Sequence, residues 1–504
     1  MRNFNKNVLE WLEEAAEAYP DRVVYEDENE KITFAELRNE AKRVGSGIIR
    51  ENLPEGPVAV MMERSVHTIA VFLGVVYAGR AYAPIEAKDP LSRRERILST
   101  LGNPALITDD RDLLIENCRT LNSSVLIKNE IDENAIKNVK DRLTENDPLY
   151  IIFTSGSSGN PKGVITSHRS LICYINSYRD VMGIDETDVL ASQSQLDYIA
   201  AIRDIYLPLL TGARTFLLPK EYFMQPDVLF DSMNRHGVTA AGWSSSAVTV
   251  ITKLGAFKDC ELKGFKKLCF SGSVMPGKVL ALWQENLPEC RFVNQYGPTE
   301  ATASCTYYVV DHKVSEDEVL PIGKAYDDYR VFLLSENGKA VPQGEYGEIC
   351  VSGPCVTLGY YNDAERTAAA FVQNPLNSAY REIIYKTGDI GRFREDGELE
   401  FHGRSDRQIK HMGHRVELDE IEAAAMEIKG VSECAALYDS KKENLWLLYT
   451  GETASREIAV QLKGMLPLFM VPRKIKQLES LAKLPNGKTD IKTLEKETFG
   501  GIRK

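Results

Sequence analysis

The chain has 504 residues, which is too long for one hydrophobic core, so at least two domains are expected. With 43% hydrophobic and 27% charged residues, its composition is that of a globular protein rather than a disordered or fibrous one. The formal net charge of −12 argues against nucleic-acid binding, because phosphate backbones select basic surfaces.

Nine cysteines are scattered from Cys118 to Cys434 without a CxxC pair, which favours buried or free thiols in a reducing cytosol over a metal site. The first residues are amphipathic and acid-rich and lack the apolar segment of a signal peptide. No apolar run reaches the length of about eighteen residues that a membrane span needs. We therefore predict a cytoplasmic protein without membrane or nucleic-acid partners.

The N-terminal elements are predicted to be helical. Residues 8–18 indicate a helix that is closed by Pro20. A second helix follows, because Thr33 and Glu36 stand at the spacing of a capping box.

Short apolar runs then alternate with helical patterns, which is typical of α/β units with buried parallel strands. The runs are "PVAVMME", "TIAVFLGVVYAG", "PALITDD", "SVLIK", "LYIIF", "ARTFLLP", "VTAAGW" and "KKLCFSG". From about Val331 the pattern changes to strands broken by turn signals such as Asn337-Gly338, which predicts antiparallel β structure. About a hundred residues after Gly403-Arg404 suffice for a small separate α+β domain.

The string "TSGSSGNPKG" follows the apolar run "LYIIF" and has the composition of a phosphate-binding turn. Its glycines let the backbone approach an anion, its hydroxyls and N–H groups can donate, and Lys162 adds positive charge. It lacks the spacing of a P-loop. A plain surface loop is the alternative.

Four further strings follow in order: "NQYGPTEAT" from Asn294, "YKTGDIGRF" from Tyr385, "FHGRSDRQIKHMGHRVELDEIE" from Phe401 and "KLPNGKTDIKTL", which contains Lys488. Taken singly, each could be a turn, a cap or a solvated charge, and His411 and His414 could be read as a metal pair. Together they resemble the adenylate-forming (ANL) superfamily over essentially the entire chain. The resemblance is strongest to stand-alone amino-acid adenylation domains of nonribosomal peptide synthesis and to D-alanine:carrier protein ligases.

The resemblance implies an α/β fold with α+β elements. It consists of a large N-terminal domain of packed mixed and parallel sheets with a β-rich subdomain, and a small mobile C-terminal α+β domain. The expected boundaries are 1–403 for the adenylation core, 404–408 for a hinge at Asp406, and 409–504 for the lid.

The resemblance also implies an ATP site that uses Mg²⁺. Tyr296 would lie against adenine, Asp389 would bind the ribose hydroxyls and Glu300 would bind Mg²⁺. Lys488 would act as the catalytic ammonium, together with Thr299 near the α-phosphate. The full set of implied nucleotide contacts is Thr154, Ser155, Gly156, Ser157, Ser158, Gly159, Lys162, Asn294, Tyr296, Gly297, Asp389 and Arg404.

Two half-reactions would share this site: a carboxylate attacks the α-phosphorus of MgATP, and a thiol then takes the acyl group. Asp406 and "QIKHMGHRVEL" resemble amino-acid adenylation domains more than CoA ligases. The chain stops soon after Lys488, so the expected acceptor is the phosphopantetheine arm of a separate carrier protein. The alternatives are an aryl- or acyl-CoA ligase and a non-catalytic adenylate-binding protein.

The amine contact of the substrate is where the pattern departs from the family. Leu196 stands where the family has an aromatic residue, and Asp197 lies two residues too far upstream of Leu210-Thr211-Gly212. Asp197 could meet a displaced amine such as a β-amino group, meet an ordinary α-amine after a bulge, or cap a helix without touching the substrate.

The remaining pocket positions are mostly small, which predicts a small or polar amino acid. They are Gly242, Cys269, Ser271, Gln295, Ala303 and Ser304. Ser271-Gly272-Ser273 replaces the Cys-Gly-Glu of D-alanine ligases and puts D-alanine in doubt. Arg203 could point inward and bind a second carboxylate, although an arginine on such a helix is more often solvated.

Overall fold

The computed structural model describes residues 5–110, 113, 115, 118–156, 160–440, 442–483 and 489–500. The chain forms two compact units. The first comprises Met1–Ala87, Leu101–Phe153 and Gly163–Ser405, and the second comprises Lys88–Thr100, Thr154–Lys162 and Asp406–Lys504. The break after Ser405 lies inside the expected hinge range, whereas the two short segments of the second unit fall inside the expected core domain. Movement at this break stays a prediction.

A nine-stranded sheet forms one half of the first unit, and its six central strands are parallel. Its spatial order is β15 (Lys324–Ala325), β14 (Thr306–Val310), β13 (Arg291–Tyr296), β12 (Lys267–Ser271), β11 (Ala240–Ser244), β9 (Val189–Ser192), β10 (Arg214–Leu217), β1 (Val23–Glu26) and β2 (Lys31–Thr33). The predicted strands "ARTFLLP", "VTAAGW" and "KKLCFSG" are therefore confirmed as β10, β11 and β12.

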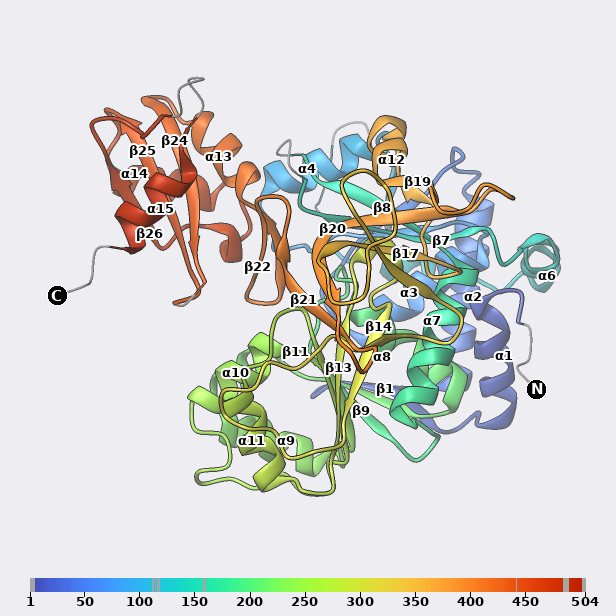
Figure 1. The fold of residues 1–504 in the computed structure, drawn as a ribbon. Coiled ribbons are helices and arrows are strands. Elements are labelled where there is room, and N and C mark those ends of the chain that lie inside the picture. The colour runs from blue at the N-terminus through green and yellow to red at the C-terminus, as the bar shows by residue number, and fades with distance from the viewer. Residues whose placement is uncertain are drawn as a thin grey trace. The chain divides into compact units, whose positions relative to one another are not determined.

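Helices cover both faces of this sheet (Figure 1). One face packs against η1 (Lys220–Met224), α9 (Pro226–Arg235), α10 (Ser245–Lys253) and α11 (Gly277–Asn286). The other packs against α1 (Val8–Ala18), α7 (His168–Met182) and α8 (Ala201–Thr211). Side chains alternate along each strand, so Phe270 points into the first layer while its neighbour Cys269 points into the second.

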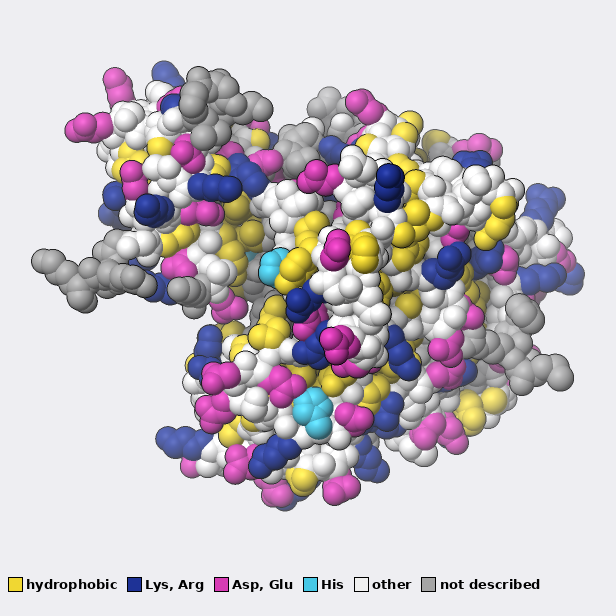
Figure 2. All heavy atoms as spheres, viewed as in Figure 1, with side chains coloured by type: hydrophobic (Ala, Val, Ile, Leu, Met, Phe, Trp, Pro, Cys, Tyr) yellow, Lys and Arg dark blue, Asp and Glu magenta, His cyan; other side chains and the backbone are white. Residues whose placement is uncertain are grey.

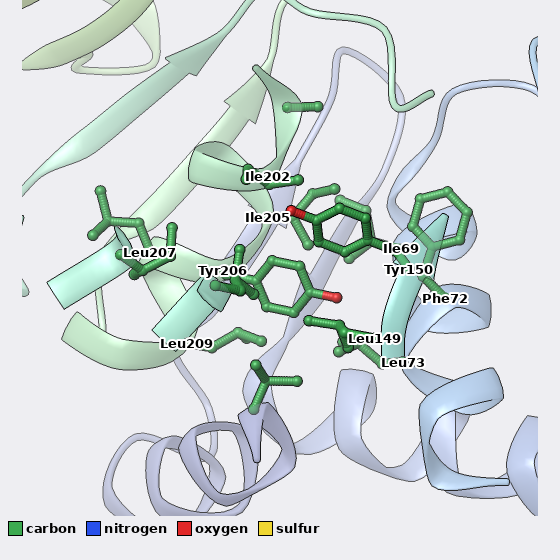
Figure 3. Packing of buried hydrophobic residues seen from close by; sticks show 14 of the residues in the cluster. Ile69, Phe72, Leu73, Leu149, Tyr150, Ile202, Ile205, Tyr206, Leu207 and Leu209 are labelled. Atoms are coloured by element: carbon green, nitrogen blue, oxygen red, sulfur yellow. The ribbon is translucent and has the colours of Figure 1, made fainter. Parts of the chain in front are cut away.

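A seven-stranded sheet forms the second half of the first unit. Its order is β18 (Gly359–Tyr360), β8 (Lys162–Ser167), β7 (Pro148–Thr154), β4 (Tyr82–Pro84), β3 (Val58–Met61), β5 (Ala105–Thr108) and β6 (Thr120–Asn122). Its helices are α2 (Phe34–Arg50), α3 (Val66–Tyr77), α5 (Ser123–Leu126) and α6 (Glu133–Arg142). Figure 3 shows the shared core, where α3, β7 and α8 bring their apolar side chains together.

A five-stranded antiparallel sheet completes the first unit and confirms the predicted change of pattern after Val331. It contains β16 (Arg330–Leu334), β17 (Gly347–Ser352), β20 (Ile383–Phe393), β19 (Phe371–Gln373) and β21 (Leu399–Arg404), beside α12 (Ala364–Ala370).

The second unit has its own apolar core. Its elements are α4 (Leu91–Thr100), the hairpin of β22 (Gln408–His411) and β23 (His414–Glu417), α13 (Leu418–Met426), the sheet of β24 (Val431–Asp439), β25 (Asn444–Gly451) and β26 (Lys474–Gln477), α14 (Ser455–Lys463), η3 (Leu468–Met470) and α15 (Ile491–Phe499). The α+β composition predicted for the residues after Gly403-Arg404 agrees with helices α13 and α14 and the sheet that contains β25.

The predicted α/β fold class with α+β elements is confirmed, as are the first helix and the Thr33–Glu36 capping box of α2. Two apolar runs were assigned wrongly. "TIAVFLGVVYAG" is helix α3, in which every residue except His67 is buried, so its apolar surface runs all round and hides the helical period. "SVLIK" overlaps the short helix α5, which follows the Asn122 cap.

The sequence also led to expectations about the cysteines, the surface charges and membrane-spanning segments. All nine cysteines are free, and four of them are buried. On the face drawn in Figure 2, basic and acidic side chains are interspersed. Within the described ranges, no helix combines the length and apolarity needed to cross a bilayer.

Candidate active site

Tyr296, Asp389 and Arg404, which we call the Tyr296 cluster, meet at the end of β13. The Tyr296 hydroxyl and Arg404 Nη1 donate to different oxygens of the Asp389 carboxylate. Burial raises the pKa of Tyr296 well above its usual range, so the hydroxyl keeps its proton. Arg404 Nη2 also donates to the Thr387 carbonyl at 3.2 Å. A flat ring, an acceptor carboxylate and a cation are thus held together by hydrogen bonds.

Thr299 and Glu300 follow in the short turn η2 (Thr299–Ala301). Glu300 is fully buried, and its carboxylate accepts a hydrogen bond of 2.8 Å from the Tyr360 hydroxyl. A buried carboxylate needs such a partner or a cation, and carboxylate oxygens are ligands that Mg²⁺ prefers. The residues present therefore fit the implied metal.

Gly297 lets the chain fold back against the next turn. A Cβ on Gly297 would lie 2.5 Å from the Ser304 Cα atom, so no other residue fits. Thr302 and Ala303 adopt φ angles of 50° and 71°, which cost about 1 kcal/mol each for residues other than glycine. This strained turn brings Ala303 and Ser304 beside the Tyr296 segment.

The segment Thr154–Lys162 belongs to the second unit. There, Ser155 Oγ donates to the Arg415 carbonyl at 2.8 Å. In the described part of the chain, the buried Thr154 hydroxyl has no hydrogen-bond partner, which suits a group that would donate to a phosphate oxygen. Ser157, Ser158, Gly159 and Lys488 lie outside the described residues, and Asn294 donates to the Pro321 carbonyl at 2.8 Å.

The predicted pocket residues of three parallel strands share one face of the nine-stranded sheet. Gly242 of β11 is in register with Cys269 of β12, and Ser271 of β12 is in register with Gln295 of β13. Because positions two apart on a strand share a face, Cys269 and Ser271 point the same way.

Arg203 on α8 reaches the same face. It is 2% exposed, its Nη2 donates to the Gly242 carbonyl at 3.0 Å, and its Nη1 lies 3.7 Å from Cys269 Sγ. The solvated interpretation of Arg203 is therefore wrong. We call Arg203, Gly242, Cys269, Ser271 and Gln295 the Arg203 cluster.

Asp197 lies elsewhere in the first unit. It lines a small cavity of about 20 Å³ that also includes Arg64 and Glu86 but none of the other predicted pocket residues. The N-cap residue of α8 is Ala200, so Asp197 does not stand at the N-cap position of that helix.

Sequence reasoning missed two tyrosines. Tyr360 holds Glu300, and Tyr178 of α7 lies under the Arg203 guanidinium, with the Cζ atom 5.5 Å from its ring centroid. A usable signal for Tyr178 was its helical spacing of four from Tyr174, which predicts that both rings share one face of α7. Nothing in the sequence pairs Tyr360 with Glu300.

The class that this site and fold define is that of the adenylate-forming enzymes. A model of the family described as AMP-binding enzyme matches residues 12–361, and the chain belongs to that family. It is an adenylate-forming ligase that uses ATP.

Curated relatives include single enzymes and modules of large synthases. The D-alanine--D-alanyl carrier protein ligase of Lactiplantibacillus plantarum is 30% identical over 512 residues, covering 98% of this chain and 99% of that protein. Surfactin synthase subunit 3 of Bacillus subtilis is 29% identical over 499 residues, covering 97% of this chain but 39% of that protein. The chain thus spans less than half the length of the synthase subunits it matches.

Solved structures agree on the fold. The Vibrio cholerae adenylation domain AlmE, in complex with glycyl-adenosine-5'-phosphate, superposes with a TM-score of 0.83 at 21% identity, covering 99% of this chain and 98% of that one. An artificially fused adenylation–PCP di-domain from Klebsiella oxytoca gives a TM-score of 0.83 at 22% identity, covering 98% and 97%.

Proposed function

We propose that the chain adenylates the carboxylate of a small or polar amino acid and then passes the acyl group to the phosphopantetheine thiol of a separate carrier protein. The observation that carries the proposal is the adjacency of two clusters on β13. Gln295 belongs to the Arg203 cluster, and the next residue, Tyr296, belongs to the Tyr296 cluster. Tyr296 ends the strand and packs in the same core layer as Cys269 of the Arg203 cluster, so an acid and a nucleotide bound at this end of β13 would be close enough to react.

Each residue has a proposed role in the first step. Glu300 would hold Mg²⁺, which neutralises phosphate charge, while Asp389 and Arg404 would orient the nucleotide and Thr299 the α-phosphate. The carboxylate oxygen attacks the α-phosphorus, the bond to the bridging oxygen breaks, and pyrophosphate leaves. Lys488 would stabilise the charge that develops during this attack.

In the second step, a carrier thiol must reach the site at which the acyl-adenylate was formed. We propose that the C-terminal segment 409–504 turns about Asp406 so that the carrier thiol attacks the acyl carbon and AMP leaves. Full-length similarity to a D-alanyl carrier protein ligase supports a carrier acceptor. A cytoplasmic location fits this chemistry and stays a prediction.

Pyrophosphate exchange with a panel of α- and β-amino acids tests the first step, with Lys488→Ala as the inactive control. Mass spectrometry of a holo-carrier protein after incubation with the preferred acid and ATP tests the second. Exchange driven by an amino acid and a carrier mass increased by the acyl group are expected. Exchange with amino acids but not with benzoates or fatty acids would support the proposal. Exchange with benzoates or fatty acids but not with amino acids would overturn it.

A second candidate, an aryl- or acyl-CoA ligase, is favoured by one observation. Asp197, the proposed amine contact, lines a cavity apart from the Arg203 cluster. If Asp197→Ala leaves exchange with amino acids unchanged and CoA is acylated faster than a carrier, this candidate replaces the first.

A further inference from the structure

The Arg203 guanidinium carries a buried charge that the described part of the protein does not neutralise by an ion pair. Its hydrogen-bond acceptors in the protein are the Gly242 carbonyl and the Cys269 sulfur. Burial raises the pKa of the Cys269 thiol to about 11, so the thiol is neutral. The next residue, Asp204, is buried as well, and burial raises the pKa of its carboxyl group to about 6. Asp204 and Arg203 attract each other, but they form no ion pair in the described chain, and a buried arginine without a hydrogen-bonded anion is costly.

Polar atoms around Arg203 are also unsatisfied. Over the described residues, Arg203 Nε and both polar atoms of the Gln295 amide are buried without a hydrogen-bond partner. The Tyr326 hydroxyl is a fourth such atom, and Tyr326 packs edge-on against Tyr174 at 6.4 Å between ring centroids. Unsatisfied buried groups are rare in native proteins, and three such atoms within the Arg203 cluster indicate a missing polar partner.

The glycine at position 242 leaves space for the Arg203 guanidinium. A Cβ on Gly242 would lie 3.1 Å from Arg203 Cζ and 3.0 Å from the Tyr178 hydroxyl, which is tighter than normal packing. The Tyr178 ring supports the charge from the other side, with the Cζ atom 5.5 Å from the ring centroid.

Helix α8 holds Arg203 in place. Figure 3 shows Ile202, Ile205, Tyr206 and Leu209 of this helix packed in the core with side chains of α3 and β7. Their burial fixes the helix, and Arg203 extends from it to β11. A side chain fixed in this way is preorganised to bind a ligand.

We propose that Arg203 binds a second carboxylate of the acid that is activated, so that the substrate is a dicarboxylic acid. This inference rests on the proposed function for the acid's reacting carboxylate. The planar guanidinium offers Nε and an Nη to a carboxylate side by side, which discriminates against a neutral amide of the same shape.

The test compares acids with their amides. Pyrophosphate exchange is measured for wild type and Arg203→Met with aspartate, glutamate and succinate against asparagine, glutamine and succinamate. We expect wild type to prefer the acids and Arg203→Met to lose kcat/KM for them by about 100-fold or more, with a much smaller loss for the amides. Arg203→Lys should recover part of the preference for acids.

Arg214→Met is the matched control. Arg214 belongs to the same sheet and pairs with Glu26 at 2.6 Å, away from the Arg203 cluster. The Arg214→Met variant should keep the preference of wild type for acids over amides. A preference for amides in wild type, or an equal loss for acids and amides in Arg203→Met, would overturn the inference.

A binding measurement separates this inference from the proposed function. Thermal unfolding is followed with each acid and amide added. A higher Tm with acids only, lost in Arg203→Met, supports the Arg203 site even if no exchange occurs, in which case only the proposed function fails. No Tm difference between acids and amides, with exchange also absent, would overturn both.

Discussion

The Tyr296 cluster and the Arg203 cluster lie at neighbouring residues of one strand but differ in how their buried polar groups are satisfied. Both oxygens of Asp389 accept hydrogen bonds from the protein, whereas Arg203 Nε and the Gln295 amide have no partner in the described part of the chain. The first cluster is complete before a ligand arrives. The second is stabilised when a ligand supplies the missing acceptor and donors.

We expect the largest effect from disrupting the Tyr296 cluster, in which the protein itself satisfies the Asp389 carboxylate. Asp389→Ala removes the carboxylate that accepts hydrogen bonds from both Tyr296 and Arg404 and so holds the two side chains together. We expect kcat/KM for ATP to fall about 1000-fold, by the same factor for every acid. Pyrophosphate exchange at varied ATP measures this, with the exposed Asp396→Asn as control. A loss that differs between acids would show that the two clusters are not separate.

One buried histidine outside both clusters also has a nitrogen without a hydrogen-bond partner in the described chain. It tests whether such an unsatisfied atom always indicates a ligand site. His168 Nδ1 accepts from the Val8 N–H group at 3.3 Å, its Nε2 is unpaired in the described chain, and burial lowers its pKa to about 4. Unfolded histidine titrates near pH 6.5, so the unfolded state binds the proton first as the pH falls. Stability should therefore drop by about 3 kcal/mol between pH 6.5 and 4.

Urea unfolding at several pH values measures the contribution of His168. His168→Asn keeps an acceptor for Val8 but cannot titrate, so its stability should fall less steeply with acid than that of wild type. Identical slopes for both proteins would show that His168 does not carry the effect. Substrate preference should be the same in both.

A smaller effect is expected from crowding the Arg203 cluster. Gly242→Ala places a methyl group 3.1 Å from Arg203 Cζ and should shift the guanidinium. We expect the preference for acids over amides to fall about tenfold while KM for ATP stays the same. Gly464→Ala is the control, because the nearest atom to its added Cβ lies 3.4 Å away. An unchanged preference would mean that the guanidinium does not take part in selection.

The smallest effect concerns the carboxylate proposed for the metal. Tyr360→Phe removes the 2.8 Å hydrogen bond to Glu300 without removing a ligand. We expect the Mg²⁺ concentration for half-maximal exchange to change by about three- to tenfold. Titration with Mg²⁺ at saturating ATP measures it. No change would indicate that Tyr360 only stabilises the fold.

The sequence predicted much of this, and the failures have physical reasons. The capping box of α2 and the alternating runs of β10 to β12 are local signals, so they were found. Helix α3 was missed as a helix because burial on all sides removes its period. The burial of Arg203 depends on a distant glycine, Gly242, and the position of Asp197 depends on loop geometry, so neither can be obtained from spacing along the chain.

Helix α8 combines two tasks. Apolar side chains that include Ile202, Ile205 and Leu209 anchor it in the core, while Arg203 donates to the Gly242 carbonyl of β11. A change at position 203 or 242 therefore alters recognition while the anchoring side chains stay as they are. A library restricted to these two positions would be small enough to screen completely, and it would test whether acid preference can be changed while the fold is kept.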